Sequence, residues 1–143
     1  MMRILGIDFG DKTLGLAVSD ILGITAQPLD QYRTQGSEED KSFFLTLVTR
    51  HRIGKIVIGL PLRMDGTEGT RVDKTRRFAD WLQSFLDLPV VFWDERLTTK
   101  QALLILREQN SGPRKKKQQK DKVAAALILA AYLESERDEP PAV

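Results

Sequence analysis

Three acidic residues stand at the margins of apolar segments, where a cation or several hydrogen-bond donors would be needed to hold them. Asp8 lies inside the apolar run of residues 4–9, Glu95 follows the apolar run of residues 90–93, and Asp121 begins a helical apolar pattern. Burying an unpaired carboxylate costs several kcal/mol, so a partner is expected for each acid. Mg²⁺ and Mn²⁺ prefer oxygen ligands, and two ions about 3.5–4 Å apart can hold the attacking and leaving oxygens of a phosphodiester. The pattern favours a site for one or two divalent cations.

Each of these acids also has an ordinary structural interpretation. Asp8 could begin a turn, and Glu95 could pair with Arg96 or cap the helix that follows. Asp121 falls in a first helical turn, where an acid is favourable without any function. Asp94 competes with Glu95 for the same role, because neighbouring strand residues point to opposite faces and only one of the two can face the site.

The residue types that are missing narrow the chemistry further. The chain has 143 residues, no cysteine and a single histidine, His51, which is expected on the surface of a helix. Thiolate nucleophiles, cysteine metal sites and disulfides are excluded, and a reducing cytoplasm is the expected location. No apolar run approaches the roughly 20 residues that a membrane span requires, so no membrane partner is expected.

Basic residues are distributed unevenly along the chain. The net charge is only +2, from 22 basic and 20 acidic residues, but residues 114–122 hold six basic residues and one acid. This run indicates a polyanionic partner or, alternatively, a solvated loop. Other basic residues near the acids could bind backbone phosphates. The candidate nucleic-acid contacts are Lys12, Arg63, Arg71, Arg77, Thr98, Arg114, Lys115, Lys116 and Lys117.

The elements that must position these residues can be read from the hydrophobic pattern. Strands are predicted over residues 3–9, 14–19, 25–33, 56–58 and 90–93. Helices are predicted from residue 37, after the loop at 62–69, after Thr98 or Thr99, and from about Lys120 to Glu134. Trp81 and Trp93 fall on apolar stripes and are expected to be core residues.

The element order predicts an α/β fold with one mixed five-stranded sheet. Three antiparallel strands should be followed by two parallel strands, with helices on both faces. We expect one domain over residues 1–135 and a flexible tail over residues 136–143.

Three motifs in this order resemble a known family. They are Gly6–Gly10 with residues 15–20, Gly59–Leu62 with residues 64–69, and Asp94–Thr99. Together with Asp121, they resemble the YqgF or RuvX family, often described as Holliday-junction resolvases. The resemblance covers the chain from about Arg3 to Leu133.

The resemblance implies an RNase H-like fold and a metal-dependent nuclease that acts on structured nucleic acid. Asp8, Glu95 and Asp121 match the acidic triad of the family, which implies Mg²⁺ or Mn²⁺, with two ions expected. Family members are associated with maturation of the 5′ end of the 16S ribosomal RNA precursor, and earlier with branched DNA.

The leading hypothesis is therefore a monomeric or weakly dimeric endonuclease that processes a ribosomal RNA precursor in the cytoplasm. A Holliday junction resolvase and a nucleic-acid-binding factor without nuclease activity are the alternatives. A phosphotransferase related to actin-like ATPases is disfavoured, because a chain of 143 residues lacks the second half that would enclose a nucleotide.

Overall fold

The computed structural model describes residues 2–98 and 113–138, with the side chains of the last helix described from Val123 to Arg137. Five strands form one mixed sheet: Arg3–Asp8 (β1), Thr13–Ser19 (β2), Ala26–Arg33 (β3), Ile53–Leu60 (β4) and Val90–Asp94 (β5). Their spatial order is β3-β2-β1-β4-β5. The first three pair antiparallel, whereas β4 and β5 run parallel to β1. The predicted sheet is confirmed.

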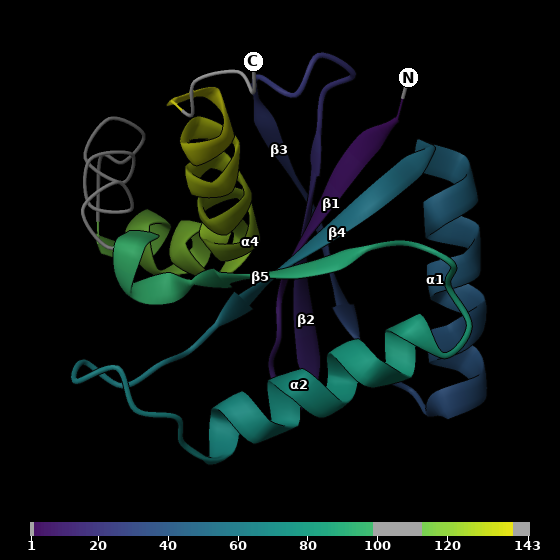
Figure 1. Ribbon diagram of the computed structural model, residues 1–143, viewed down its shortest axis with the longest axis horizontal. Coiled ribbons are helices and arrows are strands. Elements are labelled where there is room, and N and C mark those ends of the chain that lie inside the picture. Colours follow the sequence, from purple (N-terminus) through teal and green to yellow (C-terminus); the bar gives the residue numbers. More distant parts are fainter. Residues whose placement is uncertain (1, 99–112, 139–143) are drawn as a thin grey trace, which may run out of the picture.

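Helices cover both faces of this sheet, as the sequence predicts (Figure 1). They are Ser37–His51 (α1), Thr70–Gln83 (α2), the short 3₁₀ helix Glu95–Thr98 (η1) and Pro113–Asp138 (α4). Figure 1 shows α1 and α2 on one side of the sheet and α4 on the other.

Side-chain alternation along the strands divides the core into two parts. In β1, Leu5 and Ile7 pack in the cluster that includes Phe44 of α1 and Leu82 of α2. The alternate residue Ile4 packs in the cluster that includes Ala125 and Leu129 of α4. Residues two apart in a strand therefore pack against helices on the same side of the sheet, and adjacent residues point to opposite sides.

The α4 face of the sheet is built from small residues. A Cβ on Gly6 would lie 2.8 Å from Cβ of Leu129, and a Cβ on Gly59 would lie 2.6 Å from Cδ1 of Ile128. At Gly6 the added atom would also lie 3.1 Å from the backbone oxygen of Ala125, so the helix itself would have to shift, whereas at Gly59 the end of the Ile128 side chain would have to move. Glycine at these two positions lets α4 pack directly on the backbones of β1 and β4.

The last helix differs from its predicted boundaries. It begins at Pro113, where about Lys120 was predicted, and it continues to Asp138, past the predicted end at Glu134. The basic run 114–122 is therefore helical in its backbone and is not a loop that precedes the helix. Proline is favourable in the first helical turn, and Lys, Arg and Gln are good helix formers, which explains the early start.

Two further predictions concern helices. The helix predicted after Thr98 or Thr99 lies outside the described residues, and residues 95–98 form η1. No helix within residues 2–98 and 113–138 has the length and apolar character needed to cross a membrane.

Candidate active site at the ends of the parallel strands

The predicted acids Asp8 and Glu95 lie at one edge of the sheet. Asp8 is the last residue of β1, and Glu95 follows the last residue of β5. Because β1, β4 and β5 are parallel, their carboxyl ends meet at the same edge, where open α/β sheets bind ligands. The side chain of Glu95 crosses over β4 between them, so that a Cβ on Gly59 would lie 2.8 Å from its Oε1.

The two carboxyl groups interact directly. Burial, the negative charge of Asp8 and a side-chain hydrogen bond with Asp8 together raise the pKa of Glu95 to about 7. A hydrogen bond between two carboxyl groups requires that one of them hold a proton. Without a cation, the pair therefore keeps a proton near neutral pH that an isolated glutamate would lose.

Arginine 71 supplies positive charge at this pair. The Arg71 guanidinium lowers the pKa of Glu95, against the effects of burial and Asp8. Its Nη2 donates a hydrogen bond of 3.4 Å to the carbonyl oxygen of Phe9, the residue that follows Asp8. Arg71 is exposed and lies in the first turn of α2, so it can also contact a phosphate that approaches the acids.

The structure resolves the competition between Asp94 and Glu95. Asp94 forms an ion pair with Arg96, in which Nη2 donates to Oδ2 at 2.6 Å, and this hydrogen bond holds the pKa of Asp94 below its usual value. Arg96 also donates to the carbonyl oxygen of Met64, which ties the end of β5 to the loop between β4 and α2. Glu95, and not Asp94, is the partner of Asp8.

The backbone of α4 brings Asp121 toward the same edge of the sheet. Ala125 lies against the sheet, where a Cβ on Gly15 would be 3.6 Å from Cβ of Ala125, and Gly15 pairs with Asp8 in the β1–β2 ladder. Asp121 precedes Ala125 by four residues in the same helix, so the two share a helical face. The side chain of Asp121 lies outside the described part, and its role as a ligand stays a prediction.

The described pair fits a hard divalent cation. Its donors are carboxylate oxygens only, which suit Mg²⁺ or Mn²⁺ better than the nitrogen and sulfur ligands typical of zinc. A cation bound at the pair would replace the shared proton and relieve the repulsion between the carboxylates. Among the side chains that the structure describes, no group of three or more His, Cys, Asp and Glu residues is close enough to hold a metal.

The predicted nucleic-acid contacts occupy several places. Lys12 is exposed in the turn between β1 and β2, and Arg63 lies against Gly69 at the start of α2. Arg77 lies on α2, on the sheet face opposite α4. Thr98 is buried, and its hydroxyl donates to the carbonyl oxygen of Glu95 at 2.8 Å. The backbones of residues 114–117 lie at the start of α4, and their side chains are outside the described part.

Two residues shape the site although the sequence analysis gave them no role in it. Gly59 leaves the space that Glu95 occupies over β4, and Arg96 forms an ion pair with Asp94. The signal for Gly59 was its position at the end of an apolar strand. Nothing in the sequence distinguishes the Arg96–Asp94 pair from an Arg96–Glu95 pair.

Comparison with protein families gives one match over nearly the whole chain. The sequence profile of the RuvX family, described as Holliday junction resolvase, matches residues 2–135. A protein of Syntrophus aciditrophicus named "Putative pre-16S rRNA nuclease" is 46% identical over 138 residues, covering 96% of this chain and 92% of that protein. A protein of Halothermothrix orenii with the same name is 45% identical over 132 residues, covering 92% and 94%.

Two solved structures of resolvases have a similar fold. RuvC of Thermus thermophilus in complex with a Holliday junction substrate aligns with a TM-score of 0.55 and 20% identity, covering 94% of this chain and 96% of that chain. The yeast mitochondrial Holliday junction resolvase Ydc2 aligns with a TM-score of 0.58 and 13% identity, covering 95% and 79%. At these identities the similarity concerns the fold, and it confirms the expected RNase H-like architecture.

Proposed function

The chain belongs to the RuvX family, described as Holliday junction resolvases, and we propose that it is a metal-dependent endonuclease for structured nucleic acid. The observation that carries this proposal is the contact between Asp8 and Glu95 at the carboxyl ends of the parallel strands. Two interacting carboxylates can supply oxygen ligands to a divalent cation, and the arginine beside them can bind a phosphate.

Each residue has a stated task in this proposal. Asp8, Glu95 and Asp121 would hold Mg²⁺ or Mn²⁺. A bound divalent cation supplies a Lewis acid that polarises the phosphate and makes an attacking water easier to deprotonate. Arg71 and Arg63 bind the phosphate backbone beside the acids, and Lys12 and Arg77 contribute further contacts. Thr98, which the sequence also offered as a contact, is buried with its hydroxyl donated to the carbonyl oxygen of Glu95, so it is given no contact with the substrate.

The basic first turns of α4 are proposed to hold the substrate. Asp121 follows four basic residues in the same helix: Arg114, Lys115, Lys116 and Lys117. The residues proposed to bind the substrate therefore lie within two helical turns of the proposed metal ligand. Six basic residues within residues 114–122 suit a polyanion, and their contribution to binding should depend on salt.

We propose that the substrate is the precursor of 16S ribosomal RNA, in the bacterial cytoplasm where ribosomes are assembled. The support is the name shared by relatives that are 45–46% identical to this chain over most of their length. A four-way DNA junction is the second candidate, favoured by the description of the RuvX family.

One cleavage experiment tests both the activity and the substrate. A 16S precursor fragment and a four-way DNA junction are incubated with the protein, with and without Mn²⁺. We expect Mn²⁺-dependent cleavage of the RNA, abolished by Asp8→Asn while RNA binding is kept. Asp30→Asn is the matched control, because Asp30 is exposed on the edge strand β3.

The possible results separate the candidate functions. Preferred cleavage of the junction would replace the RNA substrate by branched DNA. Salt-sensitive RNA binding without cleavage of either substrate would indicate a binding factor. Full activity of Asp8→Asn would refute the proposed site.

A further inference from the structure

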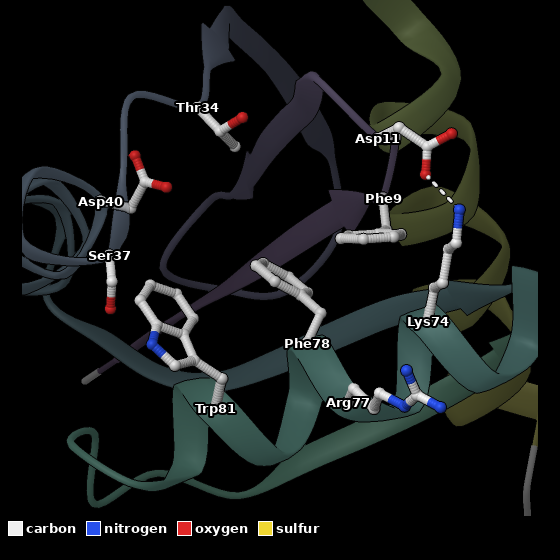
Figure 2. Close-up of a pocket in the computed structure, with 10 residues that line it drawn as sticks. Phe9, Asp11, Thr34, Ser37, Asp40, Lys74, Arg77, Phe78 and Trp81 are labelled. Carbon is white, nitrogen blue, oxygen red and sulfur yellow. Dashed lines mark hydrogen bonds and ion pairs between the residues drawn. The ribbon is translucent and has the colours of Figure 1, made fainter.

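A pocket lies on the sheet face opposite the acidic pair. Its volume is about 340 Å³, and its walls come from the turn after β1, the start of α1 and one side of α2 (Figure 2). This volume is at the lower end of the range for small-ligand sites, which suits a group the size of one nucleotide. Of the residues given a role above, only Arg77 lines this pocket.

Aromatic rings form one wall of the pocket. The ring centroids of Phe9 and Phe78 are 4.9 Å apart, and those of Phe78 and Trp81 are 5.9 Å apart with planes only 27° from parallel. All three side chains are partly buried against the core and also line the cavity. Trp81 therefore packs against the core, as predicted, and it also lines the pocket. Aromatic walls of this kind stack nucleic-acid bases without regard to sequence.

Two cations from α2 stand beside the aromatic wall. Lys74 and Arg77 are both exposed and line the pocket. Lys74 lies 3.4 Å from Asp11 in an exposed ion pair, which is weak and easily exchanged for another anion. Within the described part of the chain, the Arg77 guanidinium forms no ion pair, so it is available to a phosphate.

The acidic residues of the pocket do not oppose an anion near Arg77. Figure 2 places Asp40 across the pocket from Arg77, and Asp11 is the partner of Lys74. Asp40 accepts hydrogen bonds from the Tyr32 hydroxyl at 2.7 Å and from the backbone N–H of Gln35 at 2.9 Å. The positive charges of the pocket therefore lie on the α2 side. The carboxylate of Asp40 lies on the opposite side, where Tyr32 and Gln35 donate hydrogen bonds to it.

The pocket and the acidic pair are joined through the end of β1. Asp8 and Phe9 are consecutive, so their side chains leave the backbone toward opposite faces of the sheet. Arg71 bridges the two places, because it acts on Glu95 and donates to the carbonyl oxygen of Phe9. A strand held at the acids can therefore pass over this edge and reach the pocket with an adjoining nucleotide.

We propose that this pocket binds one unpaired nucleotide of the substrate strand, with its base against Phe78 and Trp81 and its phosphate at Lys74 and Arg77. This inference rests on the proposed nuclease function. It supplies a reason for selectivity toward structured substrates, because a base inside a continuous duplex cannot enter the pocket. The same chemistry would fit a free nucleoside monophosphate, so the source of the nucleotide must be tested.

The two tryptophans of the chain make the test internally controlled. Trp81 lines the pocket, whereas Trp93 packs against α4 on the other face. Adenosine 5′-monophosphate is titrated into the ¹⁵N-labelled protein, and the two indole N–H signals are followed by NMR, with Trp81→Phe assigning them. We expect the Trp81 signal to shift and saturate while the Trp93 signal stays in place. Ribose 5-phosphate and adenosine should each bind more weakly than the complete nucleotide.

Charge variants decide whether the cations contribute. Lys74→Gln with Arg77→Gln should weaken nucleotide binding on the order of tenfold or more, as expected for lost charge-assisted hydrogen bonds. Arg50→Gln is the matched control, because it removes an exposed cation from the far end of α1. An unmoved Trp81 signal at millimolar nucleotide, or equal affinity in the double variant, would overturn the proposal.

Two further measurements distinguish a substrate-strand site from a free-nucleotide site, and the pocket proposal from the nuclease proposal. A single-stranded RNA that shifts Trp81 at lower concentration than the mononucleotide supports a substrate-strand site, and the reverse order overturns it in favour of a free-nucleotide site. Asp8→Asn should keep the Trp81 shift while losing cleavage. Cleavage that survives in Asp8→Asn refutes the acidic site alone, whereas a missing Trp81 shift refutes the pocket alone.

Discussion

At the residue scale, the site depends on how a proton and a cation compete for Glu95. Burial and Asp8 together place its pKa at about 7, above its ordinary value of 4.5. The acid pair is therefore protonated in a pH range where the same residues in the unfolded chain are charged. Cation binding must release this proton, so it should strengthen as pH rises.

The raised pKa predicts an unusual pH dependence for the metal-free protein. A carboxyl group whose pKa is raised by folding adds stability below its unfolded pKa, and this stability is lost as pH rises through the folded pKa. In EDTA, we expect the melting temperature of the wild type, relative to Glu95→Gln, to fall between about pH 4.5 and about pH 7. Thermal unfolding of both proteins across this range is the measurement.

Metal provides the control for this pH dependence. Adding Mn²⁺ should raise the melting temperature more at about pH 8 than at about pH 5, because the carboxylates are free of the proton at the higher pH. If wild type and Glu95→Gln show the same pH dependence in EDTA, Glu95 does not hold the extra proton.

At the element scale, the small-residue face of the sheet sets the distance between α4 and the strands. Gly6 and Gly59 let Leu129 and Ile128 pack directly on the backbone, which brings the first turns of α4 to the edge where β1 ends. Only Gly59 also contacts Glu95. Gly6 therefore affects only the packing of α4, whereas Gly59 affects both the packing of α4 and the position of Glu95.

A pair of alanine variants tests this difference. Gly6→Ala should destabilise the fold by about 1–3 kcal/mol, because its methyl group would overpack Cβ of Leu129 and the backbone of Ala125. Gly59→Ala should cost less stability, because the Cδ1 end of Ile128 can move away from the added methyl group. Gly59→Ala should in addition raise the Mn²⁺ concentration needed for half-maximal cleavage, because its Cβ would lie 2.8 Å from Oε1 of Glu95. Chemical denaturation and Mn²⁺ titration of cleavage are the measurements. An equal change of the Mn²⁺ requirement in both variants would contradict the proposed role of Gly59.

How far the sequence predicts these elements depends on the kind of signal. The apolar run of residues 3–9, the turn residues after it and the alternation of large and small apolar residues over 14–19 predict the hairpin, because strands buried on both faces are apolar along most of their length. The predicted start of α4, at about Lys120, is wrong. The basic residues before it are good helix formers, so the helix already begins at Pro113. To choose between Asp94 and Glu95, one must know that β5 ends at Asp94 and that Arg96 pairs with Asp94. Neither fact follows from the local sequence pattern.

At the scale of the whole molecule, charge is divided between an acidic edge and a basic helix start. The net charge of +2 conceals the six basic residues of the run 114–122, which precedes most of the apolar part of α4. Long-range attraction for nucleic acid should arise mainly from this run, whereas the acids act only at contact. The monomer or weak homodimer expected from the sequence stays a prediction.

The basic run predicts a specific change in salt dependence. Lys116→Gln with Lys117→Gln should lower the slope of log affinity for single-stranded RNA against log salt by about 1.4, or about 0.7 for each lost phosphate contact. Cleavage at saturating RNA should change little. The control is Arg50→Gln with Arg52→Gln, which removes two exposed cations from the end of α1 and the turn after it. Equal slopes in the two double variants would show that the run does not contact phosphate.

The central claim is that Asp8 and Glu95 form one cation site, and a double-mutant cycle tests it most directly. The single-turnover rate of RNA cleavage in Mn²⁺ is measured for wild type, Asp8→Asn, Glu95→Gln and the double variant. Residues that act as one unit are strongly non-additive, so each single variant should lose a factor on the order of 10³ or more, and the double variant should lose little beyond that. Losses that multiply in the double variant would contradict a shared site.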